Sequence, residues 1–306
     1  MLEVDESLAW IIFIVIALAL VIADLVLHRK PEHIPVKRAL LETSIWIIVA
    51  VAYGVFIYLS FGDQRGIEFF TAYIMEESMS IDNLFVFIII FSLFGIPDEC
   101  QHKALFYGIF GAVIFRLIFM LIGVELMKFH FIMYVFGILL AYVAIKTIIS
   151  KDEEEGNSKI ATFMSKHFNT APELDGDKFF TVYNGKKMMT PLLMCVIVIE
   201  LSDLVFAMDS IPAVLALSSD LLVIYTSNIF AILGLRSLYF AIKGGLNSLK
   251  YLKYGLGAIL LFIAAKLLLV DFVEIPIRAS LAFIAIVLII TIAASLLSNR
   301  KEKATA

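Results

Sequence analysis

Nine long apolar stretches are the feature that most limits how this chain can fold. Each is about 20 residues long, the length that an α-helix needs to cross the hydrocarbon core of a bilayer. The chain of 306 residues is 61% hydrophobic, and only 17% of its residues are charged. A soluble protein of this length needs far more polar surface. The sequence therefore predicts an all-α polytopic membrane protein, with spans at 8–27, 41–61, 67–94, 104–124, 129–149, 190–217, 221–242, 254–270 and 277–297.

The basic residues predict how these spans are oriented. The segments 28–39, 95–103, 150–189, 243–253 and the tail after 297 carry 17 Lys and Arg residues, and the segments on the opposite side carry 3. Because cytoplasmic loops are enriched in Lys and Arg, the N-terminus is expected outside and the C-terminus in the cytoplasm. We expect a multi-pass protein of the plasma (inner) membrane. The acidic N-terminus lacks the basic leader of a cleaved signal peptide, so the first span is expected to be retained.

The segment 150–189 is the one long loop and is expected to be cytoplasmic. Its acidic run Asp152–Glu155 is typical of a solvated linker. Further on, Asn184-Gly185 stands between two short apolar-polar segments, a signal for the turn of a β-hairpin. The loop is therefore expected to contain a small structured cap.

An internal repeat relates the central six spans. The segment I-F-G-A-V-I-F-R ends at Arg116, and I-F-A-I-L-G-L-R ends at Arg236, an offset of 120 residues. D-N-L-F-V begins at Asp82 and D-L-V-F-A begins at Asp203, an offset of 121. Spans three to five thus match spans six to eight, and the odd number of spans between the halves inverts the second. The sequence predicts an inverted 3+3 helix repeat, which places a substrate near the midplane between the first helices of the two halves.

The repeat also sets the expected organisation of the chain. Residues 1–61 form two peripheral helices, and 67–149 and 190–270 form the two three-helix repeats. The cytoplasmic loop 150–189 joins the repeats, and 271–306 forms the last helix and the cytoplasmic tail.

Acidic residues inside the third and sixth spans are the candidate functional site. A carboxylate at bilayer depth costs roughly 2.5–3.5 kcal/mol on insertion scales, so such residues are usually functional when they face a bundle interior. By helical spacing, one face of the third span carries Glu76, Ser80 and Asn83, and one face of the sixth carries Glu200 and Asp203. The alternative is that basic partners merely neutralise the acids. The expected metal ligands are Glu76, Asp82, Asn83, Glu200, Asp203 and Asp209, supported by Ser80 and Ser202.

These ligands predict the kind of cation. They offer carboxylate, amide and hydroxyl oxygens, whereas all five histidines fall in loops or at span ends. Cys100 and Cys195 have no paired spacing, which argues against a thiolate metal site. Oxygen ligation suits hard cations such as Mn²⁺, Mg²⁺ or Ca²⁺. Met75, Met79 and Met208 either pack nearby or supply one thioether that favours Mn²⁺.

Basic residues inside the spans have two open interpretations. Arg116 and Arg236 either hold an acid of the site when the metal is absent or form structural ion pairs. Lys146 and Lys266 lie nearer span ends, where they either pair with the site acids or snorkel to the interface. Asp24 is expected to pair with the basic cluster that follows it at 28–30.

Two motifs resemble a known family. The pattern E-x-S-x-S-x-D-N-x-F-V-F at 76–87 and the run T-P-L-…-I-E-L-S-D-L-V-F-A-M-D-S-I-P-A at 190–213 resemble the two signatures of the TerC family of integral membrane proteins. The resemblance covers nearly the whole chain. It implies a member of the lysine-exporter-like transporter superfamily, associated with Mn²⁺ efflux, alkaline-pH response and tellurite resistance. Glu77 stands where the family often has a basic residue, which favours Glu76 as the site glutamate. Carried over to this chain, the family's acids are Glu76, Asp82, Glu200, Asp203 and Asp209.

The expected function is export of Mn²⁺ by alternating access about a midplane carboxylate site, coupled to protons. One alternative is a Ca²⁺ transporter with the same site. Another is a membrane scaffold that recruits partners through 150–189 in metal-stress or tellurite-resistance responses. An enzyme is not expected, because no H-E-x-x-H motif or Ser/His dyad lies in any span. The expected partners are the metal ion, the lipid bilayer and protons, with no nucleic acid and no prosthetic group.

Overall fold

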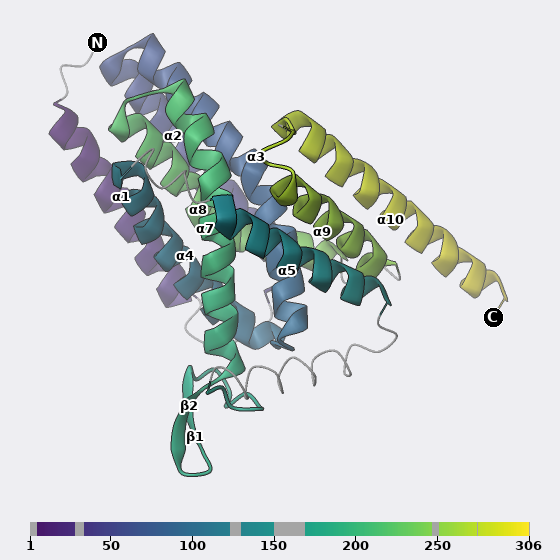
Figure 1. Ribbon diagram of the computed structural model, residues 1–306. Helices are drawn as coiled ribbons and strands as arrows, with labels where there is room; N and C mark the ends of the chain where they lie inside the picture. Colours follow the sequence, from purple (N-terminus) through teal and green to yellow (C-terminus); the bar gives the residue numbers. More distant parts are fainter. Residues whose placement is uncertain are drawn as a thin grey trace. The chain divides into compact units, whose positions relative to one another are not determined.

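A computed structural model describes residues 5–27, 34–122, 130–149, 169–246, 251–273 and 275–305. These residues form nine α-helices and one two-stranded antiparallel sheet (Figure 1). Each expected span corresponds to one helix, so the all-α polytopic class is confirmed. The helices are α1 (Glu6–Leu27), α2 (Val36–Phe61), α3 (Asp63–Leu93), α4 (Asp98–Ile122), α5 (His130–Ile149), α7 (Pro191–Leu217), α8 (Leu221–Leu246), α9 (Leu252–Leu268) and α10 (Ile277–Thr305).

Most helices begin or end outside the expected limits. α2 begins at Val36 and α10 continues to Thr305, because polar residues such as Lys37 and Lys301 extend a helix beyond its apolar part. Within the described residues, six helices (α1, α2, α4, α7, α8 and α10) are long and apolar enough to cross a membrane. α3 has 31 residues, and its acids lower its hydropathy. At a rise of about 1.5 Å per residue, it is roughly 46 Å long and is still able to span a bilayer.

The outer helices expose apolar side chains, as membrane-embedded helices do. In the most apolar part of each helix, only 11% of α1 and 22% of α10 is buried, against 89% of α8. Exposed residues such as Leu18 and Ile289 on these faces suit contact with lipid tails. Helices tolerate this environment because their backbone groups are bonded within the segment.

The chain forms two compact units, of which the first comprises Met1–Ile81, Pro97–Met127 and Ile199–Ala241. An aromatic cluster lies in its core. The Phe230 ring lies 5.4 Å from Phe13 and 5.2 Å from Tyr53, and Tyr53 lies 5.7 Å from Phe69. Gly62 ends α2 with a positive φ of 94°, a conformation that glycine adopts without strain. This turn brings α3 directly against α2.

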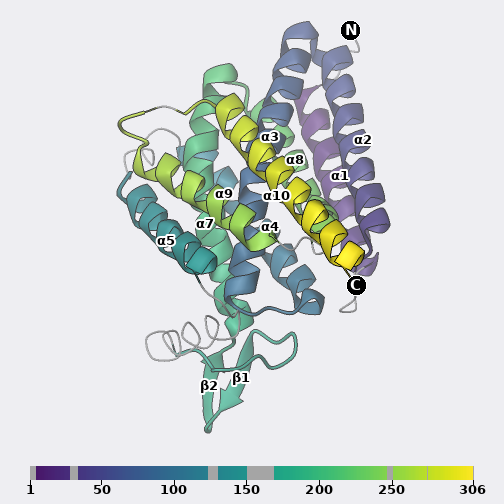
Figure 2. The same cartoon turned by 90° about the vertical axis from the view of Figure 1, so that its right-hand side faces the viewer.

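The second unit comprises Asp82–Ile96, Lys128–Val198 and Ile242–Ala306. In it α9 lies between α5 and α10 (Figure 2). A Cβ added to Gly137 of α5 would lie 3.3 Å from the Ala264 carbonyl oxygen, and one added to Gly257 of α9 would lie 3.5 Å from that of Ala144. Gly137 corresponds to Gly257, and Ala144 to Ala264, by the offset of 120 residues. The same contact is therefore made twice, and the two helices pack antiparallel. Such a contact favours the inverted repeat, which stays a prediction.

The expected β-hairpin is confirmed. β1 (Phe180–Tyr183) pairs antiparallel with β2 (Lys186–Met189), and Asn184 and Gly185 connect them with φ of 51° and 74°. Two consecutive positive φ values are typical of a type I′ turn, which matches the twist of the strands. The acidic run Asp152–Glu155 lies outside the described residues.

A polar turn precedes the hairpin. The Thr181 hydroxyl donates to Asp175 Oδ2 at 2.8 Å, and the Lys178 ammonium lies 3.1 Å from the same oxygen. The Thr181 hydrogen bond, together with the Lys178 charge, holds the pKa of Asp175 below its usual range. The end of the long loop is thus a folded element.

Candidate functional site

Arg116 of α4 lies at the centre of a buried polar group in the first unit. Its guanidinium is 1% exposed. Its Nε and Nη2 donate to Asp203 Oδ2 and Oδ1 of α7 at 3.3 and 3.1 Å. Its Nη1 donates to Glu76 Oε1 of α3 and, at 3.2 Å, to Asn228 Oδ1 of α8. Oxygens from three helices thus surround one cationic side chain from a fourth. We call these four residues the Arg116 group.

The face of α3 that was predicted from helical spacing is buried. Glu76, Ser80 and Asn83 are 1%, 0% and 2% exposed. Glu77 lies elsewhere, where it accepts a hydrogen bond from the Tyr73 hydroxyl at 2.9 Å. Of these two adjacent acids, Glu76 is therefore the one that contacts Arg116.

Glu200 lies beside the group on α7, one turn before Asp203. Both of its carboxylate oxygens are buried, and neither has a hydrogen-bond partner among the described residues. The carboxylate rests on α4, where a Cβ on Gly111 would overlap it, 2.6 Å from Oε2. Glu200 is close enough to Asp203 for their charges to repel each other. In this orientation the Glu200 carboxylate occupies the space that a side chain at position 111 would take.

Two carboxylates, those of Glu76 and Asp203, therefore share one guanidinium, and a third, that of Glu200, lies beside Asp203. With all four residues ionised, Glu76, Glu200, Asp203 and Arg116 have a net charge of −2. In the part of the chain that the structure describes, no three His, Cys, Asp or Glu side chains lie together so that they could hold a metal ion. Within the Arg116 group, the guanidinium takes up the space between Glu76 and Asp203. The predicted metal site stays a prediction.

Several expected site residues lie outside this group. Asp82 and Asn83 are 8% and 2% exposed but belong to the second unit, as does Lys266. The Ser202 hydroxyl donates to the Ile199 carbonyl oxygen of its own helix at 2.7 Å. The side chains of Asp209 and Lys146 lie outside the described residues.

Arg236, the counterpart of Arg116 in the predicted repeat, pairs with an acid from a different helix. It forms an ion pair with Asp24 of α1, and its Nη1 donates to His102 Nε2 at 2.9 Å. Asp24 was expected to pair with the basic cluster at 28–30, which lies outside the described residues. His102, expected at a span end, lies inside α4 and is 7% exposed. A cavity of about 160 Å³ beside this pair is lined mainly by apolar side chains, Trp46 and Phe106 among them.

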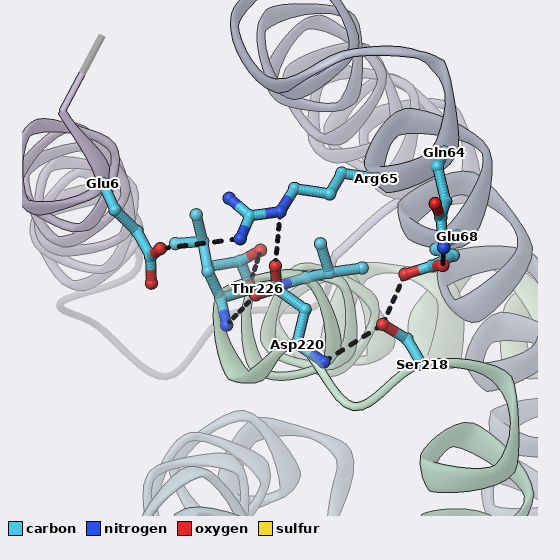
Figure 3. Close-up of polar contacts among 9 residues, drawn as sticks. Glu6, Gln64, Arg65, Glu68, Ser218, Asp220 and Thr226 are labelled. Carbon is cyan, nitrogen blue, oxygen red and sulfur yellow. Dashed lines mark hydrogen bonds and ion pairs between the residues drawn. The ribbon is translucent and has the colours of Figure 1, made fainter.

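A further polar group holds the turn between α7 and α8 (Figure 3). Arg65 Nε of α3 lies 2.6 Å from Asp220 Oδ2, and its Nη2 lies 3.7 Å from Glu6 Oε2 of α1. The Ser218 hydroxyl donates to Glu68 of α3. Asp220 also caps α8, since its Oδ1 accepts the Leu222 amide at 3.0 Å. These contacts orient α7 and α8, the helices that carry Asp203 and Asn228.

Asn228 is the member of the Arg116 group that is absent from the predicted site. It stands in the T-S-N run at 226–228, and all three residues are 0% exposed. An uncharged amide in an apolar span gives a weaker signal than a carboxylate. The signal that was available is that a buried amide needs hydrogen-bond partners.

The fold and the Arg116 group define a multi-pass integral membrane protein with a charge-paired site inside its helices. A family model described as "Integral membrane protein TerC family" matches residues 61–303. The chain therefore belongs to the TerC family, as its two acidic motifs predict.

Relatives match almost the full chain. "Uncharacterized membrane protein STKORF319" of Myxococcus xanthus is 40% identical over 295 residues, which cover 95% of this chain and 92% of that protein. A membrane protein of Rickettsia bellii (strain RML369-C) is 40% identical over 294 residues, with coverage of 95% and 97%. "Putative membrane-bound redox modulator Alx" of Escherichia coli (strain K12) is 35% identical over 301 residues, with coverage of 94% for both chains. No solved structure matches the chain.

Proposed function

We propose that this protein is a secondary transporter that exports a hard divalent cation, with Mn²⁺ as the favoured substrate. The observation that carries the proposal is the set of buried oxygens around the Arg116 guanidinium. Asp203 contributes two of them and Glu76 a third. Carboxylate oxygens suit Mn²⁺, Mg²⁺ and Ca²⁺ better than soft cations. One divalent cation balances the two negative charges of Asp203 and Glu76, the acids that it would take over from Arg116.

In this proposal Arg116 and the cation compete for the same oxygens. Buried acids are strongly destabilising without a partner, so Arg116 stabilises the two acids that it contacts while the site is unloaded. A bound cation takes over the oxygens and displaces the guanidinium. The loaded form can then cross from the inward-facing to the outward-facing state, and the return crossing takes place with protons on the carboxylates, as coupling to protons requires.

Export of a divalent cation needs an energy source. With the inside negative by about 100 mV, expelling two charges costs roughly 4.6 kcal/mol before any concentration difference is counted. Protons are the natural coupling ion, because the same carboxylates bind either protons or metal. The proposal takes the N-terminus to be outside and the C-terminus in the cytoplasm of an inner membrane, from the distribution of Lys and Arg.

Flux in proteoliposomes tests the proposal. The full chain is reconstituted, a pH gradient is imposed, and Mn²⁺ uptake is compared between the wild type and Asp203→Asn. Asp24→Asn is the matched control, because Asp24 pairs with Arg236 and not with Arg116. We expect flux that depends on the gradient, is lost in Asp203→Asn and persists in Asp24→Asn. Flux of Ca²⁺ alone would change the substrate and keep the mechanism, whereas full Mn²⁺ flux in Asp203→Asn would refute it.

A scaffold is the second candidate, and the hairpin favours it. Phe180, Val182 and Tyr183 are 50%, 73% and 44% exposed, more apolar surface than a solvated hairpin needs. A scaffold would act through this loop and would not depend on the acids in the membrane. Replacing residues 178–189 with a Gly/Ser linker should then abolish function in cells, while Asp203→Asn should not.

A redox role, suggested by the name of the Escherichia coli relative, is a separate hypothesis. Cys100 and Cys195 are 6% and 0% exposed. Buried thiols of this kind are poorly accessible to thiol chemistry. Cation transport is the function that the described geometry supports best.

A further inference from the structure

We propose that Asn228 of α8 is a ligand of the transported cation and makes the site selective for hard cations. This inference rests on the proposed function, because it names a further residue of the same site. Asn228 carries no charge and was not expected from the acidic motifs.

The contacts of Asn228 direct its oxygen at the candidate site. Its Oδ1 accepts a hydrogen bond at 3.2 Å from Arg116 Nη1, the same nitrogen that donates to Glu76. Because a guanidinium only donates, the amide oxygen and not the amide nitrogen must face Arg116. The side chain is 0% exposed, so this orientation is held by packing.

The other end of the amide has no partner. Asn228 Nδ2 is buried and makes no hydrogen bond among the described residues. A buried unsatisfied donor costs about 1–3 kcal/mol, so a leucine of similar size would pack here at lower cost. Asparagine at this position is therefore explained by a role for its oxygen, which outweighs the cost of the unsatisfied nitrogen.

A cation that displaces Arg116 would meet this oxygen. The atoms that lose a donor are those of Asp203, Glu76 and Asn228. Two carboxylates and one amide oxygen form a set of hard ligands. Because the amide is neutral, it adds an oxygen ligand without changing the charge of the site. Replacing the amide with a soft ligand should shift the preference of the site toward soft cations.

A purely structural role predicts something different. If Asn228 only orients Arg116, any replacement weakens the site equally toward all cations. Asn228→Cys separates the two roles, since a thiolate that contacts the cation recruits Cd²⁺ at the expense of Mn²⁺. Ser227→Cys is the matched control, because Ser227 is equally buried and its hydroxyl donates to the Ile224 carbonyl oxygen of its own helix at 3.0 Å.

The experiment measures Mn²⁺ and Cd²⁺ flux in proteoliposomes for the wild type, Asn228→Cys and Ser227→Cys. We expect the ratio of Cd²⁺ to Mn²⁺ flux to rise about tenfold or more in Asn228→Cys and to stay near the wild-type ratio in Ser227→Cys. Cys100 and Cys195 are present in all three proteins and provide a constant background. If Asn228→Cys does not reach the membrane, Asn228→His with Zn²⁺ replaces it, because imidazole suits Zn²⁺.

The outcomes separate this inference from the proposed function. An unchanged ratio in Asn228→Cys, with Mn²⁺ flux in the wild type, overturns the ligand role and leaves the transporter standing. A wild type that carries no divalent cation overturns both. An equal rise in Ser227→Cys also overturns the ligand role, because that thiol belongs to a different face of α8.

Discussion

Arg116→Leu should destabilise the protein in a way that Mn²⁺ reverses. Arg116 forms ion pairs with both Glu76 and Asp203, and all three side chains are at most 6% exposed. Removing one partner of a buried ion pair typically costs about 3–5 kcal/mol, because the remaining charges stay buried without compensation. The variant should therefore unfold at a clearly lower temperature than the wild type in the absence of metal.

Mn²⁺ should restore much of this loss. A ligand at 100 times its dissociation constant stabilises the folded state by about 2.7 kcal/mol. This gain is close to the lower end of the expected loss of about 3–5 kcal/mol. In the wild type the same cation must first displace Arg116, so its stabilising effect should be smaller. Flux should still be lost in the variant, because Glu76 and Asp203 then lack their Arg116 partner in the empty site.

Thermal unfolding of purified protein in detergent measures both effects, with MnCl₂ compared against KCl at matched ionic strength. Arg236→Leu is the control, since Arg236 is also buried and pairs with a carboxylate outside the Arg116 group, that of Asp24. We expect Arg236→Leu to be destabilised without recovery by Mn²⁺. Equal stabilisation by Mn²⁺ in both variants, or none in Arg116→Leu, would refute the view that Arg116 stands in for a cation.

Three further predictions concern packing and turns. Gly111→Ala should push the Glu200 carboxylate aside by about 1 Å and lower Mn²⁺ flux tenfold or more. Gly108→Ala is the control: its Cβ would meet Ile199 at 3.1 Å, and its flux should stay near that of the wild type. Arg65→Ala should lower the free energy of unfolding by only about 1 kcal/mol or less, as measured by thermal unfolding, because its ion pairs are partly exposed. Gly185→Val should strain a turn with φ of 74° by about 1–2 kcal/mol and so speed trypsin cleavage in the hairpin. An unchanged cleavage rate would contradict the type I′ turn.

The sequence alone determined the parts of this protein that depend on local pattern. Stretches of about 20 apolar residues predict membrane helices, because every backbone group in lipid must be bonded within its segment. Asn184-Gly185 predicts the hairpin, because few residues adopt two successive positive φ values. The cost of burying a carboxylate also marks Glu76 and Asp203, along with Asp82, Glu200 and Asp209, as candidate site residues before any contact is known.

Only the tertiary structure decided which charged residues pair. Arg116 and Arg236 occupy equivalent places in the predicted repeat, yet Arg116 binds Glu76 and Asp203 whereas Arg236 binds Asp24. The partners come from different helices, so no spacing along the chain encodes the choice. Asn228 was absent from the predicted site for the same reason. Its amide contacts Arg116 only because α8 packs against α4. Burial of a charge demands a partner, but the packing of helices determines which partner is within reach.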